Sequence, residues 1–151
     1  MHLLKFICNV NAIQALMLAK KASILGVPIL LIFFGALFIS SQDVDMARSA
    51  LLKVIPVIVI GYALISLSEW LAVIAIDKSI WKLSSAFAMS TIGGIIFIYG
   101  IFQLEQNFFD PFLSEINVLE LQPFLSVLFV VLMMVRLYTV AIIGIALERR
   151  V

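Results

Sequence analysis

Four long runs of apolar residues, separated by short polar segments, dominate the chain. A helix needs about 20 mostly apolar residues to cross about 30 Å of hydrocarbon. The runs that approach or exceed this length cover residues 23–39, 54–76, 83–104 and 123–147. The first is the shortest, but no charged residue lies between Ala22 and Gln42, so its helix can extend to both interfaces. The pattern predicts an all-α, polytopic membrane protein built as a four-transmembrane-helix bundle.

The segments between and before these runs are short. Residues 1–22 form an apolar head with alanines at three- or four-residue spacing, which predicts an N-terminal cytoplasmic interfacial helix, separate from the first span or continuous with it. Pro28 lies near the second turn of the first span, where we expect it to start or kink the helix. In the loop 105–122, Asp110 and Pro111 form a helix-start signal, and a short helix should dip into the outer interface. Residues 1–151 are therefore predicted to form a single membrane domain.

The positions of Lys and Arg predict the orientation of the chain. Seven basic residues lie on the side of the two termini: Lys5, Lys20, Lys21, Lys78, Lys82, Arg149 and Arg150. The other side carries only Arg48 and Lys53. We therefore expect a multi-pass protein of the bacterial inner (plasma) membrane with both termini in the cytoplasm. A cleaved signal peptide is the alternative for the first run, but its 22-residue lead is long and no clear small-x-small site follows.

The composition agrees with a bilayer environment and excludes several kinds of site. Hydrophobic residues make up 64% and charged residues 13% of the chain, whereas soluble domains are about 45–50% apolar and about 25% charged. The net charge of +1 gives no basic field, so we expect no direct nucleic-acid binding. Cys8 is the only cysteine and His2 the only histidine, which leaves no thiol relay and no pair of axial haem ligands. We expect no catalytic residue, no metal and no cofactor, and thus no enzyme.

Two ionisable residues lie inside predicted spans. Glu69 in the second span and Arg136 in the fourth would each cost about 2.5–3.5 kcal/mol if they faced lipid. Both helices run from outside to inside, and the two side chains can meet. Tyr62 and Ser66 share the helical face of Glu69. A structural ion pair is the leading interpretation; the alternatives are a conduction or proton-transfer role for Glu69 and a partner or lipid contact for Arg136.

Small residues in the third span predict close helix packing. They are Ala86, Ser90 and Gly94 at four-residue spacing, and Gly93 and Gly100 seven residues apart. Small side chains let helix backbones approach where lipid offers no hydrophobic drive. The contact lies either within the chain or between subunits of a homo-oligomer.

The outline of a small four-helix inner-membrane protein is shared by several families. Small multidrug transporters resemble this chain in size and in having a membrane glutamate, although theirs lies in the first helix. Colicin immunity proteins and phage exclusion proteins are similar as small bundles with short loops. The membrane subunit of the two-gene Kiwa antiphage system, KwaA, resembles it in having four helices and acting with a cytoplasmic partner. This resemblance covers the whole chain as architecture, without a shared motif, and implies a role in phage defence.

These observations lead to one functional hypothesis and its alternatives. We expect a non-enzymatic membrane anchor or sensor subunit that oligomerises. Its cytoplasmic head, the loop between spans two and three, and its tail would dock a cytoplasmic protein partner. The alternatives are a small transporter or ion conduit that uses Glu69, and a protein like the colicin immunity proteins.

Overall fold

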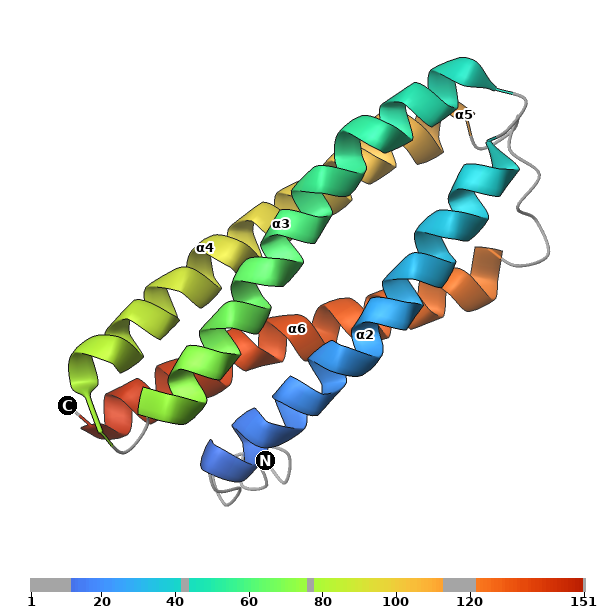
Figure 1. Cartoon of the computed structure of the whole chain (residues 1–151). Helices are drawn as coiled ribbons and strands as arrows, with labels where there is room; N and C mark the ends of the chain where they lie inside the picture. The colour runs from blue at the N-terminus through green and yellow to red at the C-terminus, as the bar shows by residue number, and fades with distance from the viewer. Residues whose placement is uncertain (1–11, 42–43, 76–77, 113–121, 151) are drawn as a thin grey trace, which may run out of the picture.

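The chain folds into long helices arranged along a common direction (Figure 1). The computed structural model describes residues 12–41, 44–75, 78–112 and 122–150. Within these residues the elements are α2 (Ala12–Ser40), α3 (Asp45–Ala75), α4 (Ile80–Leu104), the π-helix η1 (Glu105–Phe109), α5 (Asp110–Phe112) and α6 (Gln122–Arg150). No strand occurs among them, which confirms the all-α prediction.

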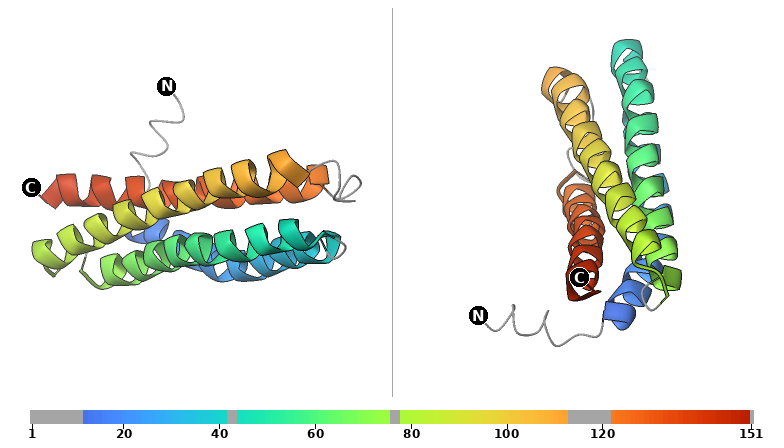
Figure 2. Two further views of the ribbon diagram at one scale, coloured as in Figure 1. Left: turned by 90° about the horizontal axis from the view of Figure 1, so that it is seen from above. Right: turned by 90° about the vertical axis from the view of Figure 1, so that its left-hand side faces the viewer.

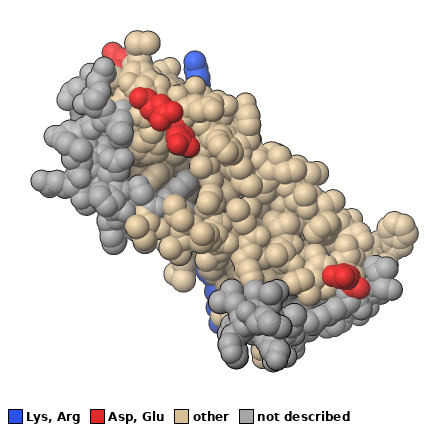
Figure 3. All heavy atoms as spheres, turned by 180° about the vertical axis from the view of Figure 1, so that it is seen from behind, with Lys and Arg blue, Asp and Glu red and all other residues tan. Residues whose placement is uncertain are grey.

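Three of the helices are long and apolar enough to cross a membrane. The candidate spans are Gln14–Ser40, Asp45–Ala75 and Ile80–Phe112. In α6, the apolar stretch among the described residues is Met133–Ile145, which is shorter than a membrane-spanning helix. The lateral surface supports this assignment, because large apolar side chains such as Leu31 and Ile39 are 70% and 71% exposed. On the face drawn in Figure 3, charged side chains gather toward the two ends of the molecule. The protein is thus compatible with multi-pass insertion into a membrane.

Successive long helices run in opposite directions and pack in pairs. The helices α3 and α4 form an antiparallel hairpin, and α6 packs against both α2 and α4. Seen from above, α2 and α3 lie on one side and α6 on the other, and α4 crosses diagonally from the level of α3 to the level of α6 (Figure 2). The start of α2, the turn between α3 and α4, and the end of α6 therefore lie at one end of the bundle, which we call the turn end.

The helix boundaries differ from the predicted spans. Of the predicted head, residues 1–11 lie outside the described residues, and residues 12–22 belong to α2 without a break. Pro28 lies inside α2 and does not start it. Pro28 is exposed on this helix, and prolines are tolerated in membrane helices because neighbouring groups can satisfy the carbonyl that proline leaves free. At the start of α4, Ser79 has an extended backbone, and its hydroxyl accepts a hydrogen bond from the Lys82 backbone N–H at 3.4 Å. Ser79 therefore caps α4.

The element α5 begins at Asp110, but the N-cap predicted there does not form. Asp110 has helical dihedral angles, and its backbone N–H donates to the Glu105 carbonyl five residues earlier. The helix α4 therefore continues through the wider turn of η1 into α5 without an N-cap at Asp110. Proline disturbs the carbonyl four residues before it, and a π-turn offers that carbonyl more room. Most of the remaining predicted loop helix, residues 113–121, lies outside the described residues.

Candidate functional site

A layer of buried polar residues crosses the bundle between two apolar clusters. Its members come from all four long helices: Ser23 of α2, Ser68 and Glu69 of α3, Ser90 of α4, and Arg136 and Thr139 of α6. On the turn-end side lies a cluster that includes Leu16, Ala72, Leu83 and Ile143. On the opposite side lies a larger cluster that includes Leu30, Ile58, Phe97 and Phe108. The polar side chains are thus collected at one height, with apolar packing above and below.

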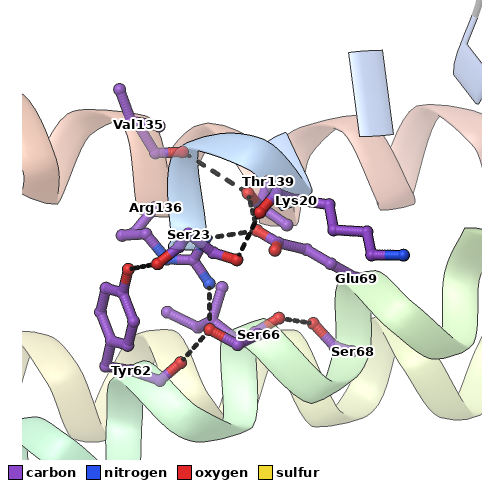
Figure 4. Close-up of polar contacts among 10 residues, drawn as sticks. Lys20, Ser23, Tyr62, Ser66, Ser68, Glu69, Val135, Arg136 and Thr139 are labelled. Carbon is purple, nitrogen blue, oxygen red and sulfur yellow. Dashed lines mark hydrogen bonds and ion pairs between the residues drawn. The ribbon is translucent and has the colours of Figure 1, made fainter. Parts of the chain in front are cut away.

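An ion pair lies at the centre of this polar layer (Figure 4). The Arg136 Nη1 atom lies 2.6 Å from Glu69 Oε1, and both side chains are 0% exposed. The second guanidinium nitrogen of Arg136 donates to the Ser66 hydroxyl at 2.9 Å. The Thr139 hydroxyl donates to Glu69 Oε1 at 2.7 Å. Charge-assisted hydrogen bonds of this kind are the strongest class in proteins, and here they join α3 to α6.

Tyr62 connects this pair to α2. The guanidinium carbon of Arg136 lies 4.6 Å from the centroid of the Tyr62 ring, a cation–π contact. The Tyr62 hydroxyl donates to the backbone carbonyl of Ser23. The structure therefore brings together the four residues that the sequence singled out, Tyr62, Ser66, Glu69 and Arg136, and adds a third helix to the junction.

Two polar atoms at the centre of the layer keep unused hydrogen-bonding capacity. Among the described residues, Glu69 Oε2 and Arg136 Nε are buried without a hydrogen-bond partner. The Ser23 hydroxyl lies beside the Glu69 carboxylate (Figure 4) but donates to the Lys20 carbonyl at 2.7 Å. A rotation about one side-chain bond of Ser23 would redirect this hydroxyl to Glu69. Within the described chain, no group of His, Cys, Asp or Glu is arranged to hold a metal ion.

The small residues of α4 pack within the chain. An added Cβ on Gly93 would lie 2.8 Å from Leu64 Cβ, and one on Gly100 would lie 2.6 Å from Ile58 Cγ1, so both glycines face α3. Gly94 faces α6, where its nearest neighbour is Val140. Of the other predicted packing residues, Ala86 lies in the turn-end apolar cluster and Ser90 in the polar layer.

Sequence reasoning missed several members of this arrangement. Ser23, Ser68 and Thr139 gave no signal of their own, although Thr139 follows Arg136 by three residues and therefore shares its helical face. Gly61 of α3 was also missed; its added Cβ would lie 2.6 Å from the backbone nitrogen of Phe97, so it forms the other side of the close α3–α4 contact.

Two apolar grooves open on the flanks of the bundle. One lies between α2 and α3, has a volume of about 470 Å³, and reaches Tyr62 past Gly35 and Phe34. The other lies between α4 and α6, has a volume of about 400 Å³, and includes Gly94 and Gly144. Neither groove is lined by Glu69 or Arg136, so the ion pair lies behind the groove walls.

Comparison of the chain with protein-family models, curated proteins and solved structures gives no match.

Proposed function

We propose that the chain is a four-span bundle of the bacterial inner membrane with both termini in the cytoplasm. The helix α6 supports a fourth span because its 29 residues extend about 43 Å at about 1.5 Å per residue. The alternating helix directions support a shared side for the start of α2 and the end of α6. The excess of Lys and Arg at the turn end supports a cytoplasmic location for that end.

Within this topology, we infer a non-enzymatic anchor or sensor subunit that works through assembly with other proteins. The polar layer carries this proposal. A conduit needs polar groups spaced along the membrane normal, so that water or ions can pass from one to the next. Here the buried polar residues of the described chain, except Ser41 just past the end of α2, lie at one height between two apolar clusters, and the central charges compensate each other. This arrangement favours a structural role in holding α2, α3 and α6 together.

The turn end is the surface proposed to dock a cytoplasmic protein partner. Trp81, in the first turn of α4, is 82% exposed, and Lys78 and Lys82 beside it are also exposed. Tryptophan is enriched at binding hot spots, and neighbouring cations would favour an acidic partner surface. Homo-oligomerisation and a role in phage defence are part of the same proposal; the defence role is supported only by the resemblance in architecture.

A small ion or proton conduit remains the second candidate. The observation that favours it is the unpartnered Glu69 Oε2, a buried carboxylate oxygen with a movable hydroxyl beside it. In this reading Glu69 would take up and release a proton or cation. A protein like the colicin immunity proteins would need neither a conduit nor a cytoplasmic partner.

Two measurements separate these candidates. A photo-crosslinking residue replaces Trp81 or, at the opposite end, Met46, which is 75% exposed. An anchor should crosslink a cytoplasmic protein from position 81 and none from position 46. In proteoliposomes, the purified protein and its Glu69→Gln variant should show the same ion and proton flux as empty vesicles. An ion or proton flux that requires Glu69, together with no crosslink from position 81, would refute the anchor proposal and support the conduit.

A further inference from the structure

A groove with mixed polar and apolar walls opens at the end of the bundle opposite the turn end. It lies between the first turns of α3 and the far end of α4 with η1 and α5, and its volume is about 740 Å³. One wall carries Asp45 and Lys53 of α3, and the other carries Gln103 and Asn107. Further along α3 toward the bundle centre, the groove is lined by apolar groups such as Val57. Tyr99 of α4 also lines the groove, and the charged lining residues, Asp45 and Lys53, both lie on the outer side of Val57.

Asp45 and Lys53 offer two opposite charges that do not neutralise each other. They lie eight residues apart on one face of α3, about 12 Å along the helix axis at about 1.5 Å per residue. Both are exposed, and among the described residues neither takes part in an ion pair. The groove thus presents a carboxylate at its outer end and an ammonium group deeper along the same wall.

The opposite wall is shaped by the π-helix. The Asn107 side chain donates to Gln103 Oε1 at 2.5 Å, which leaves the N–H groups of the Gln103 amide as donors. The turn η1 widens the backbone next to this pair. Single π-turns of this kind occur frequently at functional sites because they redirect side chains.

We propose that this groove binds a phospholipid with a zwitterionic headgroup, in which a primary ammonium follows the phosphate. From outside inward, such a lipid presents its ammonium, its phosphate and then its acyl chain. Along α3, the groove presents Asp45, then Lys53, and then Val54 and Val57 in the same order. Lys53 can extend its chain along the apolar wall toward the phosphate. The proposal rests on the membrane-spanning helices. It does not depend on a cytoplasmic partner or on which side of the membrane the turn end faces.

Native mass spectrometry in micelles containing equal amounts of phosphatidylethanolamine and phosphatidylglycerol, with matched acyl chains, tests this site. The protein should retain phosphatidylethanolamine preferentially. Asp45→Asn should lower that retention about tenfold, since one charge-assisted contact is lost, and should equalise the two lipids. Lys53→Gln should lower retention of both. Lys78→Gln and Glu148→Gln are matched controls at the turn end and should leave retention unchanged.

The lipid and its free headgroup are distinguished by competition. Soluble glycerophosphoethanolamine at the same concentration should not displace the lipid, because it lacks the acyl chain that packs along the apolar wall. Displacement would assign the groove to a soluble zwitterion and overturn the lipid proposal. Equal retention by the unaltered protein and Asp45→Asn, or an equal loss in Lys78→Gln, would also overturn it. All four substitutions are at exposed positions, and unchanged helical circular dichroism confirms that each variant is folded.

Discussion

The buried pair of Glu69 and Arg136 predicts a strong non-additive effect on stability. The perturbation is Glu69→Leu, Arg136→Leu and the double substitution. In Glu69→Leu, Arg136 keeps its hydrogen bond to Ser66 but loses its counter-charge. In Arg136→Leu, Glu69 keeps only the Thr139 hydroxyl. Both side chains are 0% exposed, so water cannot solvate the charge that remains.

The magnitude follows from two opposing considerations. Removing one partner of a buried ion pair costs about 3–5 kcal/mol in soluble proteins. Hydrogen bonds between membrane helices average about 0.6 kcal/mol, because the unfolded reference state in the membrane also finds partners. Because this pair is completely buried, we expect an energy in the upper part of this range. Each single substitution should therefore cost about 3 kcal/mol. Two leucines pack without an unpaired charge, so the double variant should recover about 2 kcal/mol or more of the summed loss.

Unfolding of the purified protein by a titration with SDS, followed by circular dichroism, measures these values. Lys78→Leu is the matched control, since it removes an exposed charge and should change the free energy of unfolding by less than about 0.5 kcal/mol. Additive losses in the double variant would refute the coupling. Glu69 would then need another reason to lie in the membrane, and the conduit would become the stronger candidate.

Three further predictions concern packing, the α2 contact and topology. In the same unfolding assay, Gly93→Ala should destabilise the protein by about 1–3 kcal/mol, because the added Cβ would meet the α3 backbone. Gly35→Ala is the control, since no atom lies within 4 Å of its added Cβ. It should be neutral or stabilise the protein by up to about 1 kcal/mol. Tyr62→Phe keeps the ring but loses the hydroxyl bond to α2, and should cost about 1 kcal/mol. After Cys8 has been replaced, a cysteine at Gln106 should react with a membrane-impermeant thiol reagent in intact cells and one at Lys78 should not; the reverse labelling would invert the proposed topology.

The helices could be predicted from the sequence more reliably than their ends. The apolar runs identified the helical class and the long apolar helices α2, α3 and α4. Hydropathy located only the apolar part of each helix, so α2 begins at Ala12 and α3 at Asp45, well before the predicted spans at residues 23 and 54. Charged residues such as Lys20 and Arg48 end an apolar run, but they do not end a helix, because Lys and Arg are good helix formers.

The continuation of α4 through η1 could not be predicted for a different reason. Asp110 followed by Pro111 is typical of a helix start, and nothing local distinguishes a start from a widened turn. What decides the outcome is tertiary packing. Phe108 is wholly buried in the larger apolar cluster, and Phe109 and Phe112 pack against it, which keeps the chain helical past Leu104.

The site was predictable where the residues were chemically unusual. A glutamate and an arginine inside apolar runs are costly, so their positions alone indicated a pair. The hydroxyl residues of the polar layer carried no such signal, because Ser and Thr in membrane helices commonly bond their own backbone. Ser68 does so, donating to the Ile65 carbonyl at 2.6 Å. Only the arrangement of the helices shows that these hydroxyls lie at the height of Glu69.

The position of the Glu69–Arg136 pair at one height gives the bundle a means of fixing helix register. Apolar side chains gain little by choosing one apolar neighbour over another in lipid, so packing alone discriminates weakly between registers. A slip of α6 by one turn, about 5.4 Å, would remove the Arg136 guanidinium from Glu69 and bring Val140 or another apolar residue beside the carboxylate. The charge would then be buried without compensation, which costs far more than the apolar contacts could return. A single ion pair is sufficient to fix the register. A conduit would need further polar residues at successive turns of the helices. At those levels this bundle has apolar residues, Leu16 and Ile143 on one side of the pair and Ile58 and Phe97 on the other.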